Sequence, residues 1–258
     1  MRTPYPGRHE LGQNFLIDPT TIATLVRLVA GTEGPIVEIG TGDGALTLPL
    51  QGLGRPLTGV EIDGRRAARL ARRVQPPTSV VHADFLRFRL PPAPYVLVGN
   101  LPFHQTTGML RHILHATGWT EAVLLVQWEV ARRRAGVGGA TMMTAQWWPW
   151  CAFGLAGRVP ATAFRPRPGV DGGVLTMSRR QRPLLPPADL NAYQALVRRV
   201  FTAPGRGLPE IVAASLPRAS RPEAHRWLRR QGLPSHALPK HLTAEQWAHL
   251  HHLSSRRA

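Results

Sequence analysis

A regular alternation of short apolar runs and helical segments constrains this chain more than any other feature. The apolar runs are typical of buried strands and fall at 35–40, 56–62, 78–83, 95–100 and 122–127. Helical spacing is found ahead of and between them, at 19–30, 63–74 and 106–117. Strands that alternate with helices predict a mainly parallel sheet with crossover helices. Further strand material is expected at 155–164 and 172–180.

The composition changes near the proline-rich segment 182–187. Beyond it, helical patterns occur at 188–202, 221–231 and 243–253, with proline-rich joints between them. We therefore predict an α/β domain over residues 1–182 and a small all-helical domain over residues 183–258.

The charge balance says more about partners than about the fold. Lys and Arg number 32 against 15 Asp and Glu, a net charge of +17, and every basic residue except Lys240 is an arginine. Arginine keeps its charge at any working pH, and its planar fork matches phosphate. Such a surplus indicates nucleic acid or an anionic membrane as partner.

Several other classes are excluded. The single cysteine, Cys151, rules out a disulfide scaffold and a cysteine-based zinc site. No metal site is expected, because the histidines have no acidic or cysteine partners that would complete one. No stretch approaches the roughly 20 apolar residues of a membrane span, and the N-terminus lacks the apolar segment of a signal peptide. The expectation is a cytoplasmic protein that binds nucleic acid and no membrane.

A glycine-rich turn follows the first predicted strand of the sheet, where residues 36–44 read IVEIGTGDG. Glycines allow a tight turn and let a ligand lie against bare backbone. The next strand ends in Glu61 and Asp63, and a carboxylate at that distance can accept hydrogen bonds from ribose hydroxyls. This pattern indicates an adenosine cofactor, and the G-x-G-x-G spacing favours S-adenosyl-L-methionine over a dinucleotide.

Asp84 ends the third strand of the series. Its carboxylate can accept a proton from the adenine amino group of a cofactor. The alternative is a helix N-cap. Its position after the glycine turn and the first acidic strand end favours the cofactor role.

The tetrapeptide Asn100-Leu101-Pro102-Phe103 directly follows the strand 95–100 and is the most specific signal in the chain. An adenine amino group is a poor nucleophile, because its lone pair is delocalised into the ring. The Asn100 side-chain oxygen and a main-chain carbonyl near Leu101–Pro102 can hold its two hydrogens. Pro102 fixes the backbone, and Phe103 offers a face for an extruded base. A turn with a buried phenylalanine is the structural alternative.

These motifs together resemble the Erm/KsgA family of rRNA adenine N6-methyltransferases, and the actinomycete Erm resistance enzymes in particular. The resemblance covers about residues 10–182. ELGQNFLID (10–18) is similar to the N-terminal cofactor motif of the family, and EIGTGDGALT, GVEID, HADFL and GNLPF follow in the family's order. FRPRPGVDGG (164–173) resembles its F-x-P-x-P-x-V motif, while segments 124–136 and 144–150 resemble the Erm branch.

The resemblance implies a Rossmann-like catalytic domain that depends on S-adenosyl-L-methionine, followed by a small RNA-facing helical domain. The implied reaction is N6-methylation of a single adenine in 23S rRNA, before ribosome completion, which gives resistance to macrolide, lincosamide and streptogramin B antibiotics. Residues implied at the catalytic centre are Asn100, Leu101, Pro102, Phe103 and, as a second aromatic of the base pocket, Phe164. Those implied to bind the cofactor are Asn14, Leu16, Gly40, Gly42, Glu61, Ile62, Asp84, Phe85 and Asn100.

Two alternatives stay open at this point. One is a KsgA-type enzyme that dimethylates adenines of the small-subunit rRNA, and segment 144–150 argues against it. The other is a non-catalytic RNA-binding protein on the same fold, which the intact glycine turn and Asn100 argue against. A monomer is expected, because no association motif is evident. The choice between one and two added methyl groups is left open.

Overall fold

The computed structural model describes residues 14–255, which divide into two compact units. The first unit comprises residues 14–131 and 154–178, and the second comprises residues 132–153 and 179–255. The second unit thus includes a segment that precedes residue 182 in the chain. The domain boundary between residues 182 and 183 stays a prediction.

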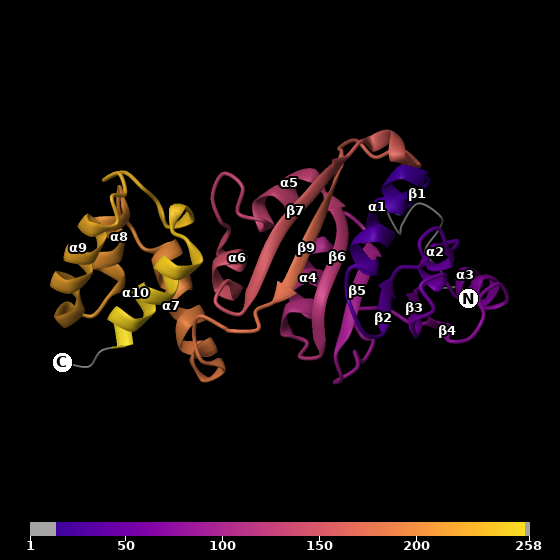
Figure 1. Ribbon diagram of the computed structural model, residues 1–258. Helices are drawn as coiled ribbons and strands as arrows, with labels where there is room; N and C mark the ends of the chain where they lie inside the picture. The colour runs from indigo at the N-terminus through magenta and orange to yellow at the C-terminus, as the bar shows by residue number, and fades with distance from the viewer. Residues whose placement is uncertain (1–13, 256–258) are drawn as a thin grey trace, which may run out of the picture. The chain divides into compact units, whose positions relative to one another are not determined.

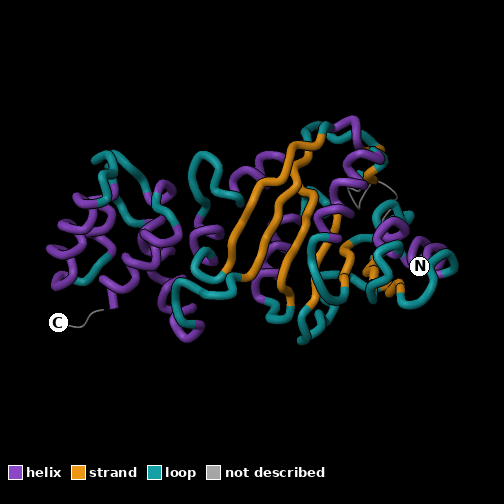
Figure 2. Tube along the Cα trace, viewed as in Figure 1, coloured by secondary structure: helices purple, strands orange, loops and turns teal. Residues whose placement is uncertain are grey.

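A seven-stranded sheet forms the centre of the fold (Figures 1 and 2). Its strands follow the order β4 (Thr78–His82), β3 (Leu57–Glu61), β2 (Ile36–Ile39), β5 (Tyr95–Asn100), β6 (Trp119–Gln127), β9 (Gly172–Arg179) and β7 (Cys151–Val159). The pairs from β4 to β6 are parallel, and β6 pairs with β9 in antiparallel register. This mainly parallel sheet and the C-terminal helices confirm the predicted fold class.

The strand order places a ligand crevice at β2. The chain passes from β2 to β3 and β4 on one side, and later returns to add β5 and β6 on the other side. In open α/β sheets the crevice beyond the carboxyl ends of the strands at such a reversal holds the ligand. The glycine turn follows β2, and Asn100 is the last residue of β5.

Helix α1 (Pro19–Ala30) shows how local sequence sets an element. Asp18 caps it, since its carboxylate accepts a hydrogen bond of 2.7 Å from the Thr21 N–H, and Pro19 occupies the first turn, where no N–H is needed. Leu25 and Val29 are completely buried. The remaining helices of the first half are α2 (Thr47–Gln51), α3 (Gly64–Ala71), α4 (Thr106–His115) and α5 (Trp128–Arg134).

The helices of the second unit are α6 (Met142–Trp147), α7 (Leu190–Thr202), α8 (Leu208–Ser215), α9 (Arg221–Arg230) and α10 (Ala244–Ser255). Tyr193 and Trp247 are fully buried in it, and the Tyr193 hydroxyl donates to the Ala145 carbonyl at 2.7 Å. The three helices predicted beyond residue 187 are confirmed by α7, α9 and α10. Among the described residues, no helix has the length and apolar character to cross a membrane.

One predicted strand differs from the structure. Instead of running over 155–164, β7 ends at Val159, and Pro160 leads into a short 3₁₀ turn, Ala161–Ala163. Proline has no N–H to continue a ladder. The chain then forms β8 (Phe164–Arg165), which pairs antiparallel with β1 (Phe15–Leu16) in a separate two-stranded sheet. This pairing joins two segments that lie about 150 residues apart in the sequence.

Candidate active site

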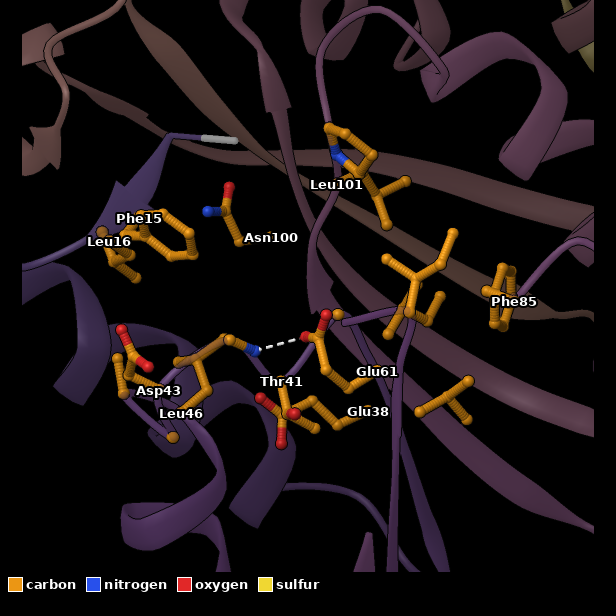
Figure 3. Close-up of a pocket in the computed structure, with 18 of the residues that line it drawn as sticks. Phe15, Leu16, Glu38, Thr41, Asp43, Leu46, Glu61, Phe85, Asn100 and Leu101 are labelled. Atoms are coloured by element: carbon orange, nitrogen blue, oxygen red, sulfur yellow. Dashed lines mark hydrogen bonds between the residues drawn. The ribbon is translucent and has the colours of Figure 1, made fainter. Parts of the chain in front are cut away.

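A cavity of about 640 Å³ lies at the carboxyl ends of β2, β3 and β5 (Figure 3). Every residue predicted to bind the cofactor lines it: Asn14, Leu16, Gly40, Gly42, Glu61, Ile62, Asp84, Phe85 and Asn100. Leu101, Pro102 and Phe103 line it as well. The structure therefore brings the two predicted constellations to one cavity, and their individual roles stay predictions.

The glycine turn forms the floor of this cavity below β2. Gly40, Gly42 and Gly44 all have positive φ, at 70°, 54° and 92°, a region that other residues rarely adopt. At Gly44 space is limiting as well, because a Cβ there would lie 2.6 Å from Leu70 Cδ1. The turn thus needs glycine for its backbone path and for its packing on α3.

Glu61 holds the glycine turn against the end of β3. Its side chain is 2% exposed, and its carboxylate accepts hydrogen bonds from the Gly42 N–H at 2.7 Å and the Asp63 N–H at 2.9 Å. Figure 3 shows the bond to Gly42 as a dashed line. Asp63 instead caps α3 through the Arg65 and Arg66 N–H groups. Of the two acids at this strand end, only Glu61 lines the cavity.

Asp84 combines the two functions that its sequence context allows. It lines the cavity, and its Oδ1 also accepts a hydrogen bond of 3.0 Å from the Leu86 N–H. The neighbouring Phe85 is buried, with its ring edge-on to His112 at a centroid distance of 5.3 Å.

Asn100 joins the N-terminal segment to the end of β5. Its Nδ2 donates to the Asn14 carbonyl at 2.7 Å, and Figure 3 shows the amide extending toward the side of Phe15. This bond orients the amide, so Oδ1 is the atom left to accept a hydrogen bond from a substrate. The Pro102 carbonyl already accepts from the Gln105 N–H at 3.0 Å.

Phe103 and Phe164 lie together but are placed differently. Their rings pack edge to face, with centroids 6.0 Å apart and an interplanar angle of 71°. Phe103 lines the cavity, whereas Phe164 is 3% exposed and belongs to the hydrophobic core with Leu16. Phe164 therefore supports Phe103 from behind, and its direct contact with a base stays a prediction.

The sequence reading missed Glu38. It is the only polar residue of β2, which reads IVEI and is buried throughout, so an acid inside a buried strand was the available signal. Its side chain is 1% exposed and lines the cavity. Its Oε2 has no hydrogen-bond partner among the described residues. Burial raises the pKa of the Glu38 carboxyl from 4.5 to about 7, and the nearby Glu61 charge adds to the effect.

This pKa predicts how the stability depends on pH. The folded protein keeps the proton of Glu38 up to about pH 7, whereas the unfolded chain releases it near 4.5. The unfolded state is therefore favoured progressively as the pH rises from about 4.5 to 7. We expect Glu38→Gln, which cannot titrate, to gain about 3 kcal/mol in unfolding free energy relative to wild type between pH 5 and 8. Urea denaturation at both pH values measures this gain, and parallel profiles of the two proteins would contradict it.

The site fits a cationic adenosine cofactor. An unpartnered buried carboxylate oxygen, on Glu38, faces a cavity whose other lining is largely apolar. Such an oxygen suits a sulfonium or ammonium group, while Glu61 and Asp84 supply acceptors for ribose and adenine. No cluster of metal-binding side chains occurs in residues 14–255.

Fold and site together define an α/β enzyme with a cavity for an adenosine cofactor. Residues 6–254 match the family described as ribosomal RNA adenine dimethylase, and the chain belongs to this family. The methyl donor of the family is S-adenosyl-L-methionine.

Three relatives show the closeness of the match. An rRNA adenine N-6-methyltransferase of Corynebacterium diphtheriae is 56% identical, over 80% of this chain and 82% of the relative. The mycinamicin-resistance protein MyrB of Micromonospora griseorubida is 48% identical, over 96% of this chain and 79% of the relative. The crystal structure of the 23S rRNA methyltransferase ErmE superposes with a TM-score of 0.85 at 31% identity, over 94% of this chain and all of that one.

Proposed function

We propose that this protein transfers a methyl group from S-adenosyl-L-methionine to N6 of a single adenine in 23S rRNA, and so confers resistance to macrolide, lincosamide and streptogramin B antibiotics. The observation that carries the proposal is the Asn100–Phe103 segment at the mouth of the cofactor cavity, next to the glycine turn. The names of the relatives support the choice of rRNA and of resistance.

Asn100 is proposed to position the target amine. Its Oδ1 accepts one N6 hydrogen, and the Leu101 carbonyl accepts the other, since the Pro102 carbonyl is engaged by Gln105. With both hydrogens held, the nitrogen lone pair points toward the donor. The methyl donor supplies an electrophilic carbon on a sulfonium. The nitrogen–carbon bond forms as the carbon–sulfur bond breaks, and the product amine loses its extra proton to solvent.

No strong general base is needed in this scheme, because the methylated nitrogen is acidic. The contribution of the protein is positioning and electrostatics. Phe103 is proposed to stack on the extruded base, with Phe164 behind it at 6.0 Å. Glu61 is proposed to hold the ribose, Asp84 and Phe85 the adenine, and Gly40, Gly42 and Leu16 the methionine side of the donor.

The test is methyl transfer from labelled S-adenosyl-L-methionine to purified 23S and 16S rRNA, with the modified base located by primer extension. One stop in the 23S peptidyl-transferase loop is expected. Two stops near the 3′ end of 16S rRNA would instead indicate a small-subunit adenine dimethyltransferase. No incorporation into either RNA would contradict the proposal.

The proposal extends to the partner and its state. Protein-poor rRNA in the cytoplasm, before ribosome completion, is proposed as the substrate, and the protein is proposed to act as a monomer.

The net charge of +17 predicts that RNA binding depends on salt. Each phosphate contact releases a counterion, so affinity falls as salt rises. For about six contacts, we expect the affinity to drop roughly a thousandfold between ~50 and ~200 mM salt. Fluorescence anisotropy with a labelled 23S fragment measures the slope, and an affinity that does not change with salt would show that arginine–phosphate contacts do not supply the binding energy.

A further inference from the structure

The guanidinium of Arg66, in the first turn of α3, contacts three segments of the chain. Its Nη1 pairs with Asp43 Oδ2 of the glycine turn, and its Nε lies 3.6 Å from Asp63 Oδ2 at the end of β3. Its central carbon lies 4.3 Å from the centroid of the Phe15 ring, in cation–π geometry. The side chain is only 22% exposed.

Two of these partners belong to the cofactor cavity. Phe15 and Asp43 both line it. The Phe15 ring also lies against the glycine turn, because a Cβ on Gly42 would be 3.2 Å from Phe15 Cδ1. Arg66 itself does not line the cavity. It can therefore affect a ligand only through the residues that it holds.

The segment that carries Phe15 has few other attachments. Strand β1 is two residues long and pairs with β8, the Ile17 N–H donates to the Ala163 carbonyl at 2.8 Å, and the Asn14 carbonyl accepts from Asn100. All three attachments are on the backbone. The contact from Arg66 acts on the Phe15 side chain and links it to the glycine turn.

We propose that Arg66 is a positioning residue that holds Phe15 against the glycine turn and thereby sets the affinity for S-adenosyl-L-methionine, an inference that rests on the methyltransferase function proposed above. The guanidinium neutralises Asp43 and covers the Phe15 ring at the same time. Loss of Arg66 leaves Phe15 free to leave the cavity wall, so the donor has to order it on binding.

Arg69 provides a matched control on the same helix. Its Nη1 lies 3.7 Å from Oδ1 of the same Asp43, and its side chain is 61% exposed. It removes the same charge near the same carboxylate, but of the two arginines only Arg66 is stacked on Phe15. A general electrostatic role predicts similar effects for Arg66→Ala and Arg69→Ala, whereas a positioning role predicts an effect for Arg66→Ala alone.

The experiment is calorimetric titration of S-adenosyl-L-methionine into the full-length protein without RNA. We expect Arg66→Ala to raise Kd about tenfold, because it loses a partly desolvated cation–π contact and an ion pair, and Arg69→Ala to change it less than about twofold. Arg66→Lys, which keeps the charge but not the planar fork, should fall between them. With saturating donor and RNA, kcat of Arg66→Ala should stay near the wild-type value while KM for the donor rises.

A double-mutant cycle separates positioning from a structural role. Phe15→Leu, which leaves all charges in place, should raise Kd by itself, and adding Arg66→Ala to it should have little further effect. Thermal unfolding monitors folding, and Phe15→Leu together with Arg66→Lys tests the inference if Arg66→Ala does not fold. Equal effects of the two alanine variants, or an undiminished effect of Arg66→Ala in the Phe15→Leu background, would overturn the inference alone. Absence of donor binding to wild type would overturn the proposed function with it.

Discussion

Replacement of Asn100 by alanine is expected to abolish methyl transfer, with a loss in kcat of about a thousandfold or more. The alanine removes the oxygen that accepts an N6 hydrogen in the transition state, and loss of one such positioned group typically costs about 10² to 10³ in rate. It also removes the Nδ2 bond to the Asn14 carbonyl, which fixes the geometry of β1. Single-turnover rates at saturating donor and RNA measure the effect.

Asn100→Asp is the matched control, since it keeps acceptor oxygens but cannot donate to Asn14. It separates the loss of the acceptor from the loss of the Asn14 contact. RNA affinity of both variants should be close to wild type, because the arginines that bind phosphate are unchanged. Retained turnover in Asn100→Ala would show that the catalytic centre lies elsewhere.

The largest effect on cofactor affinity is expected for Glu61→Gln. The Glu61 carboxylate accepts from the Gly42 and Asp63 N–H groups at once. A glutamine must turn its NH₂ toward one of these donors, which leaves a buried N–H without an acceptor. Together with the loss of a charged acceptor for ribose, this change should weaken donor binding by about a hundredfold. Calorimetry without RNA measures it.

Asp63→Ala is the control for this prediction. Asp63 ends the same strand but caps α3 and does not line the cavity. Its loss should lower the unfolding free energy by about 1 kcal/mol, as for other N-caps, with a much smaller change in donor affinity. If the two variants bound the donor equally well, Glu61 would not be the ribose ligand.

The sequence predicts the elements whose cause is local. Helix α1 spans residues 19–30 as expected, because the Asp18 cap and Pro19 fix its start and its apolar residues recur on one face. The parallel strands are likewise found where short apolar runs alternate with helical patterns. The acidic strand ends and the glycine turn meet in one cavity because parallel strands bring their carboxyl ends to one edge.

Features that depend on distant contacts were not predictable in the same way. A two-residue strand such as β1 has no periodicity, and its partner β8 follows a proline that ends the expected strand at Val159. Helix α8, at Leu208–Ser215, was also missed, since it is short and lies between proline-rich joints. Glu38 was overlooked because its pKa depends on burial by neighbouring strands. Phe164 was assigned by motif alone, which says nothing of its place behind Phe103.

Strand β1 links the two halves of the reaction. Asn14 is bonded to Asn100, where the target amine is to be held, Phe15 lies on the glycine turn, and Leu16 pairs with Phe164 behind the base platform. Any ligand that orders this strand from one end prepares it for the ligand at the other end. By thermodynamic linkage the effect is reciprocal, so donor and rRNA should bind with positive cooperativity through three consecutive residues.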